Sequence, residues 1–154
     1  MRPLFPLVLA LLLPAVAWAA PPALSGAWVS VGDDGCTPEA ALSLSLQGEV
    51  LSARITDILE PGRDRGAVCA ACDGAEQGQP LIGLTIASGL SWDGARFAGG
   101  TVLDPVSGRR YSAQAALVEA GVLEVRGYWG HPLLGRSVTW LREPVRAARC
   151  VATP

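Results

Sequence analysis

The residues with the most evident chemistry in this sequence are its four cysteines. Cys69 and Cys72 form a Cys-x-x-Cys pair, whereas Cys36 and Cys150 stand alone near the two ends of the chain. A Cys-x-x-Cys pair can exchange disulfides when cations or a helix N-terminus lower the pKa of one thiol, and two arginines lie just upstream. No alternating strand–helix pattern surrounds the pair, so we expect a disulfide that staples a loop, with thiol–disulfide exchange as the alternative.

Other reactive side chains are few and isolated. His131 is the only histidine, so any Ser-His-acid or Cys-His mechanism would have to use it. It lies in a Gly-His-Pro turn, where a solvated loop residue is the simpler interpretation. Zinc would need two ligands besides the Cys-x-x-Cys pair, and neither the lone cysteines nor one histidine have the required spacing. We therefore predict no metal and no cofactor.

The carboxylates are typical of turns and not of acid–base catalysis. Asp104 precedes a proline and is followed four residues later by Gly108, which is turn chemistry. Asp33 and Asp34 lie between two glycines and lack the spacing of a calcium loop. No glycine-rich stretch opens a phosphate-binding helix. No catalytic residue is predicted, so a non-catalytic protein is favoured, with an enzyme that acts on envelope material as a further alternative.

The first residues predict export. Arg2 is followed by an apolar run at 7–13 and by Ala17-Trp18-Ala19, which is typical of a signal-peptide cleavage site. The apolar run is shorter than the roughly 20 residues that span a bilayer, so we expect residues 1–19 to be removed and no membrane anchor to remain. Residues 20–154 form one predicted domain. The absence of lysine and asparagine favours a GC-rich bacterial source, and hence the periplasm or the medium.

The mature charge argues against a nucleic-acid-binding protein. Removal of Arg2 leaves 11 of the 12 basic residues against 14 acids, or 11 − 14 = −3, whereas nucleic-acid binding needs clustered positive charge. An oxidising compartment also favours disulfides. Of the three possible pairings we predict Cys36–Cys150 and Cys69–Cys72. A bridge that closes about 100 residues would stabilise the fold by roughly 4 kcal/mol.

The rest of the chain alternates apolar and polar residues with a period of two, which indicates half-buried strands. Glycine-containing turns separate them, for example at Gln47-Gly48 and Asp93-Gly94. We predict strands at 26–31, 41–47, 50–59, 81–87, 95–103, 109–118, 122–128 and 136–142. The fold class is all-β, an eight-stranded antiparallel up-and-down barrel, with a sandwich as the alternative. The irregular stretch 61–80 carries the Cys-x-x-Cys pair.

Two positions are similar to the closure of lipocalin-type barrels. Gly26-Ala27-Trp28 opens the first predicted strand, and Arg142 follows the last. In lipocalins a Gly-x-Trp packs beneath an arginine from the final strand. The resemblance implies that Trp28 and Arg142 close one end of the barrel, because a guanidinium can stack on an indole face.

Longer motifs resemble a bacterial exported family catalogued as domain of unknown function 2147. They are CAACDG at 69–74, QPLIGL at 79–84, GGTVLDP at 99–105, GRRY at 108–111, VRGY at 125–128 and GRSVTWLR at 135–142. The resemblance runs from about Gly26 to Arg142. It implies a lipocalin-like barrel and no particular reaction, ligand or catalytic residue.

Aromatic and polar residues near the predicted strand ends are candidates for a binding site at the barrel mouth. They are Tyr111, Arg126, Tyr128 and Trp129. Mouths of small barrels are common ligand sites, although eight-stranded barrels can also be filled by side chains. We therefore expect a non-catalytic protein that binds or carries a small, largely apolar molecule.

Overall fold

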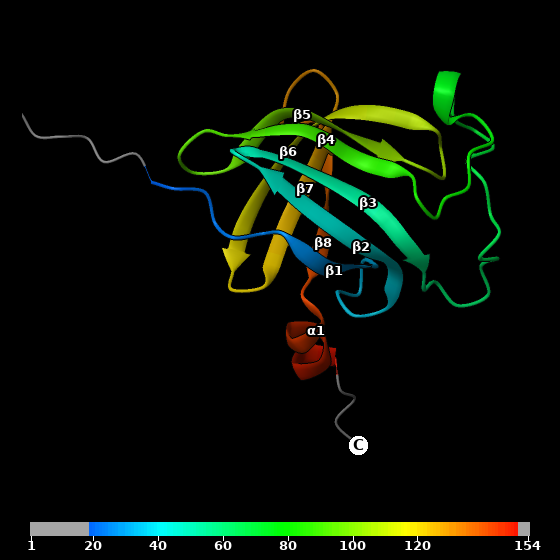
Figure 1. Cartoon of the computed structure of the whole chain (residues 1–154), viewed down its shortest axis with the longest axis horizontal. Coiled ribbons are helices and arrows are strands. Elements are labelled where there is room, and N and C mark those ends of the chain that lie inside the picture. Colours follow the sequence, from blue (N-terminus) through cyan, green and yellow to red (C-terminus); the bar gives the residue numbers. More distant parts are fainter. Residues whose placement is uncertain (1–18, 151–154) are drawn as a thin grey trace, which may run out of the picture.

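Eight antiparallel strands, each paired with its neighbours along the chain, close into a barrel (Figure 1). The computed structural model describes residues 19–150, so all but the last residue of the predicted signal peptide lies outside the described residues. The strands are β1 (Gly26–Val31), β2 (Pro38–Gln47), β3 (Val50–Ile58), β4 (Thr85–Trp92), β5 (Phe97–Asp104), β6 (Arg109–Glu119), β7 (Val122–Tyr128) and β8 (Gly135–Leu141). A 3₁₀ turn, η1 (Gly74–Glu76), and a helix, α1 (Glu143–Cys150), complete the described part. The predicted fold class is confirmed.

Side-chain alternation builds the barrel wall, as the sequence predicts. In β2, Leu42 and Leu44 are buried while Ser43 between them is exposed. Because successive side chains of a strand point to opposite faces, the leucines fill the interior and the serine faces solvent. Three residue pairs between β1 and β8 join the two ends of the sheet and leave no open edge.

The fourth strand is displaced from its predicted position. We expected it at 81–87, but β4 spans Thr85–Trp92. Leu81 and Leu84 are apolar because they are buried where the long β3–β4 loop packs on the barrel, and not because they belong to a strand. Gly89, with φ of 69°, lies inside β4, where the pairing with β3 shifts register between Leu51↔Leu90 and Ala53↔Ala87, so that β4 holds one extra residue. This glycine forms a bulge and does not end the strand.

Trp28 and Arg142 close one end of the barrel. The guanidinium carbon of Arg142 lies 4.7 Å from the centre of the Trp28 ring. Trp28 is almost fully buried and donates a 2.8 Å hydrogen bond from Nε1 to the carbonyl of Leu24. Arg142 donates a 2.8 Å hydrogen bond to the carbonyl of Ala23. The chain before β1 is therefore held across this end, which we call the closed end.

The helix α1 is a feature that the strand pattern did not predict. It packs on the outer face of the barrel, where Val145 contacts a small buried cluster of Val29, Val31, Val122 and Leu141. A disulfide joins Cys150, its last residue, to Cys36 in the β1–β2 turn. Because α1 buries no residue fully, the disulfide is the strongest link that holds it in place.

The β1–β2 turn that carries Cys36 is organised by Asp34. Its carboxylate accepts hydrogen bonds from the backbone N–H groups of Cys36 (3.0 Å) and Thr37 (2.8 Å) and from the Thr37 hydroxyl (2.5 Å). These bonds, the Thr37 hydroxyl first, lower the pKa of Asp34 to about 2. The aspartates here thus act in a turn, as the sequence predicts.

Candidate functional site at the barrel mouth

The alternation along β7 decides which candidate residues face the interior. Leu123 and Val125 are fully buried in the main core, so Gly127 shares their inner face. Arg126 and Tyr128 lie on the opposite, outer face. The structure thus separates two of the four predicted ligand residues from the interior of the barrel.

Tyr111 lies on the inner wall, near the open end that we call the mouth. It pairs with Val102 across β5 and β6 and is half-buried. A Cβ atom built on Gly127 would lie 3.0 Å from Val102 Cγ1 and 3.4 Å from Tyr111 Cβ. The glycine therefore leaves the room that the tyrosine ring needs. Deeper in the barrel, Phe97 and Trp140 are almost fully buried and fill the space toward the closed end.

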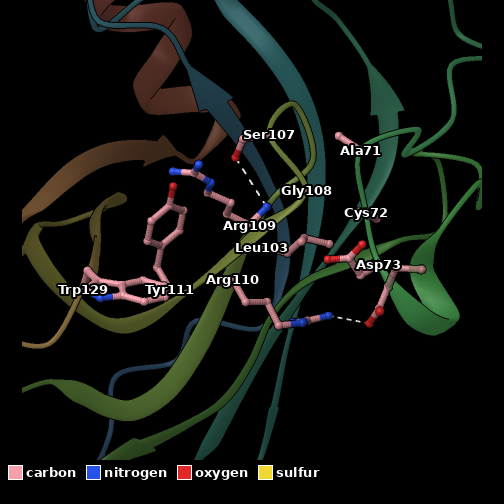
Figure 2. Close-up of a pocket in the computed structure, with 11 residues that line it drawn as sticks. Ala71, Cys72, Asp73, Leu103, Ser107, Gly108, Arg109, Arg110, Tyr111 and Trp129 are labelled. Carbon is pink, nitrogen blue, oxygen red and sulfur yellow. Dashed lines mark hydrogen bonds and ion pairs between the residues drawn. The ribbon is translucent and has the colours of Figure 1, made fainter.

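A cavity of about 820 Å³ lies at this mouth, between the long β3–β4 loop, the β5–β6 hairpin and the β7–β8 loop. Its lining residues are Ala71, Cys72, Asp73, Glu76, Leu103, Ser107, Gly108, Arg109, Arg110, Tyr111 and Trp129. Figure 2 shows Trp129 beside the Tyr111 ring and the Arg109 guanidinium close to the Tyr111 hydroxyl. The cavity thus combines aromatic surface with two arginines and two acids, and one arginine and one acid of these, Arg110 and Glu76, form an ion pair.

Arg109 is a site residue that the sequence analysis missed. Among the described residues, no carboxylate oxygen forms an ion pair with its guanidinium, whereas the neighbouring Arg110 pairs with Glu76 at 2.5 Å. The available signal was its position, two residues before Tyr111 on the same face of β6. Glu76 and Arg110 also line a second cavity of about 520 Å³ beside Ser88 of β4.

The opposite side of the mouth is acidic and already neutralised in part. Arg136 donates two hydrogen bonds to the Asp33 carboxylate, at 2.6 and 2.7 Å, and this raises the pKa of Arg136. Partial burial, then the nearby charges of Glu60 and Asp33, raise the pKa of Glu39. On the cavity side, Arg109 and Asp73 both lack an ion pair among the described residues.

The long loop is held against the β5–β6 hairpin by a very close backbone approach. A Cβ atom built on Gly108 would lie 1.9 Å from the carbonyl oxygen of Ala71, and the residue has φ of 71°. Cys69 of the same loop donates its N–H to the Gln79 carbonyl at 2.8 Å, and a single bridge joins Val68 to Pro80. Glycine at 108 thus allows the loop to form one wall of the cavity.

We predict that Gly108→Ala lowers the free energy of unfolding by about 2 kcal/mol, because the new methyl group would force the loop away from the hairpin. Urea unfolding followed by tryptophan fluorescence measures the change. Gly48→Ala is the matched control, since Gly48 also has a positive φ, of 61°, but no atom within 4 Å of the added Cβ. Equal losses in both variants would show that backbone strain, and not contact with the loop, sets the cost.

Both predicted disulfides are present, Cys36–Cys150 and Cys69–Cys72. Cys69 and Cys72 expose only 0% and 2% of their surface. An attacking thiolate needs access to a sulfur atom, and burial denies it. The arginines upstream do not face the sulfurs, because Arg63 pairs with Glu60 and Arg65 with Asp57. The pair staples the long loop.

The remaining candidates have structural roles. Arg126 donates hydrogen bonds to the carbonyls of Pro132 (2.6 Å) and Leu133 (3.4 Å) in the β7–β8 loop. His131 is exposed, and its Nδ1 accepts a 3.2 Å hydrogen bond from the Leu133 N–H. Asp104 caps the β5–β6 turn through Val106 and Ser107. Across residues 19–150, no group of three or more His, Cys, Asp or Glu side chains could hold a metal ion.

A barrel of eight antiparallel strands, closed at one end by a stacked tryptophan and arginine and open at the other, defines a lipocalin-type fold. Protein HP1028 from Helicobacter pylori, described as belonging to the lipocalin family, is similar in structure, with a TM-score of 0.65 and 15% sequence identity. The similarity covers 85% of this chain and 92% of that protein. At this identity the likeness concerns the fold.

Residues 26–142 match the bacterial family described as "Uncharacterized protein conserved in bacteria (DUF2147)". The chain belongs to this family, as the motifs in the sequence indicate. A comparison with curated proteins gave no match. Of the helices in the described part, none is long and apolar enough to cross a membrane.

Proposed function

We propose that this protein is exported and binds a small, largely apolar molecule at the mouth of the barrel, without catalysis. The observation that carries the proposal is the cavity of about 820 Å³ lined by Tyr111, Trp129 and Leu103. Apolar and aromatic walls with a few polar groups are typical of small-molecule sites. The packed closed end leaves the mouth as the side from which a guest would enter.

Arg109 favours a guest with an anionic end. Its guanidinium lies beside the Tyr111 hydroxyl in Figure 2 and has no ion-pair partner among residues 19–150. A carboxylate or sulfonate on the guest would accept hydrogen bonds from both groups, while its apolar body would lie along Trp129. The proposed ligand class is therefore an amphipathic molecule with one negative group.

Export is supported by the two disulfides and by the predicted signal peptide. Disulfides persist in oxidising compartments such as the bacterial periplasm. A thiol–disulfide exchange function has no comparable support, because both sulfurs of the Cys-x-x-Cys pair are buried.

The test uses the fluorescent dye anilinonaphthalene sulfonate, which has an apolar ring system and one sulfonate. We expect saturable binding to the native protein and a loss of roughly tenfold in affinity for Tyr111→Ala, since an aromatic wall of the cavity is removed. Tyr128→Ala is the matched control, because Tyr128 lies on the outer face of the adjacent strand. Arg109→Gln should weaken binding of the dye, which carries a sulfonate, more than it weakens binding of an uncharged analogue. Equal binding by all four proteins would overturn the proposal.

A further inference from the structure

The wall of the mouth cavity holds an aspartate whose side chain has no structural role. Asp73 lines the cavity from the long β3–β4 loop, directly before η1. An aspartate at this position ordinarily accepts a hydrogen bond from the backbone of the helical turn that follows it, but the side chain of Asp73 makes no such bond. Figure 2 shows its carboxylate turned toward Leu103, another residue of the cavity wall.

The other aspartates of the described part all have partners. Backbone N–H groups of their own turns donate hydrogen bonds to Asp34, Asp64, Asp93 and Asp104. Arginine side chains donate hydrogen bonds to Asp33 and Asp57. Within residues 19–150, Asp73 is therefore the exception, and it is also the aspartate that lines the cavity. Turn chemistry does not explain why this loop carries a carboxylate here.

The two arginines of the cavity wall do not neutralise Asp73. Arg110 is engaged by Glu76, at 2.5 Å. Arg109 forms no ion pair with any acid of the described part. The formal charges of these four side chains sum to zero, so the cavity as a whole is neutral. It nevertheless leaves one cation and one anion available to a guest.

Apolar surface lies between the two available charges. Arg109 belongs to the start of β6 and Asp73 to the loop that forms the facing wall, and Figure 2 shows Leu103 between them. Leu103 belongs to the main core and presents its remaining surface to the cavity. A guest with an anionic end alone would cover Asp73 with an apolar chain, and a carboxylate that loses its water without gaining a donor is costly.

We propose that the guest of this cavity is a dipolar molecule, with an anionic group and a cationic group joined by an apolar segment. The anionic group binds Arg109 and the Tyr111 hydroxyl, the cationic group is an amine that donates hydrogen bonds to Asp73, and the apolar segment lies over Leu103. Each charge of the guest then gains a charge-assisted hydrogen bond. This inference rests on the proposed binding function of the cavity and narrows its ligand class.

The test compares two probes of equal chain length, octanoate and ω-aminooctanoate, by isothermal titration calorimetry at neutral pH. An ammonium at the end of an alkyl chain is costly to remove from water, so a cavity without an acceptor would prefer octanoate. We expect the protein to bind ω-aminooctanoate roughly fivefold more tightly than octanoate. Asp73→Asn should reverse this preference, whereas Arg109→Gln should weaken both probes by a similar factor.

Glu49→Gln is the matched control, because it makes the same change of charge at an exposed acid in the β2–β3 turn, at the closed end of the barrel. It should keep the preference for ω-aminooctanoate. Acetylation of the probe's amine removes the positive charge without any change to the protein, and the acetylated probe should lose the advantage over octanoate. This second measurement does not depend on how well Asp73→Asn folds.

The proposal is contradicted if the protein binds octanoate as tightly as ω-aminooctanoate, if neither probe binds, or if the preference survives in Asp73→Asn. Its failure is distinguishable from a failure of the proposed function. Saturable binding of the anilinonaphthalene dye that is weakened in Tyr111→Ala, together with no preference for ω-aminooctanoate, would keep the cavity as a binding site. Only the role of Asp73 would then be removed.

Discussion

Replacing Cys36 and Cys150 together with alanine should lower the free energy of unfolding by about 5 kcal/mol. The bridge joins residues that are 114 positions apart, and the chain-entropy cost of closing a loop grows with its length. The loss is large relative to the roughly 5–15 kcal/mol that stabilises a typical domain. Urea unfolding followed by tryptophan fluorescence measures it, in the mature protein purified with its disulfides formed.

The matched control is the replacement of Cys69 and Cys72 with alanine. This bridge spans three positions, so the same relation gives about 2 kcal/mol. The urea dependence of the unfolding free energy also distinguishes the two double variants. Loss of the Cys36–Cys150 bridge lets the unfolded chain expand and therefore raises the m value. Equal losses of stability with unchanged m values would contradict the interpretation. In that case local packing, and not the long-range link, would set the contribution of each bridge.

The Cys36–Cys150 variant also tests what holds α1. None of the residues of this helix is fully buried, and its apolar contact with the barrel is made through Val145. Without the bridge we expect hydrogen exchange of its amides to approach that of an unfolded peptide, because short helices are marginal in water. Residues of β7 should keep their protection.

The barrel was predictable from the sequence because its signals are local. Seven strands were predicted to within a few residues. The signals were alternation, as at Leu42, Ser43 and Leu44, and the glycine turns between the strands. The predicted position of the fourth strand was wrong because leucines buried in a loop and leucines buried in a strand give the same apolar pattern, as Leu81 and Leu84 show. The helix α1 was missed because its position depends on a distant disulfide.

The candidate site was predicted only in part, because it depends on which face of each strand is inside. In β7, Val122 is buried beneath α1 on the outer face and Leu123 is buried in the core. The strand therefore begins with two buried neighbours, and its inner face cannot be read from hydrophobicity alone. This ambiguity allowed Arg126 and Tyr128 to be grouped with Tyr111. The cavity itself needs the long loop, whose contact with Gly108 is a tertiary feature.

The second large effect is expected for Trp28→Ala at the closed end. Trp28 is almost fully buried in the main core, and removing a buried aromatic side chain leaves a cavity that typically costs about 4 kcal/mol. The variant also leaves the Leu24 carbonyl without its 2.8 Å hydrogen bond from Nε1. Thermal or urea unfolding of the variant measures the loss.

Arg142→Met separates the stacking of Arg142 on Trp28 from the packing of the indole. Methionine keeps an unbranched apolar stem but removes the guanidinium that lies 4.7 Å from the ring centre and that donates to the Ala23 carbonyl. We expect a loss of about 1–2 kcal/mol.

The double variant completes a cycle with Trp28→Ala and Arg142→Met. If the two side chains act together, its loss of stability should be smaller than the sum of the single losses. Strict additivity would show that each residue packs independently, and the pair would then not be the element that closes the barrel. Dye binding at the mouth gives the corresponding functional control. Because Tyr111 and Trp129 line a cavity at the other end of the strands, Arg142→Met should weaken the closed end while leaving the affinity for the dye unchanged.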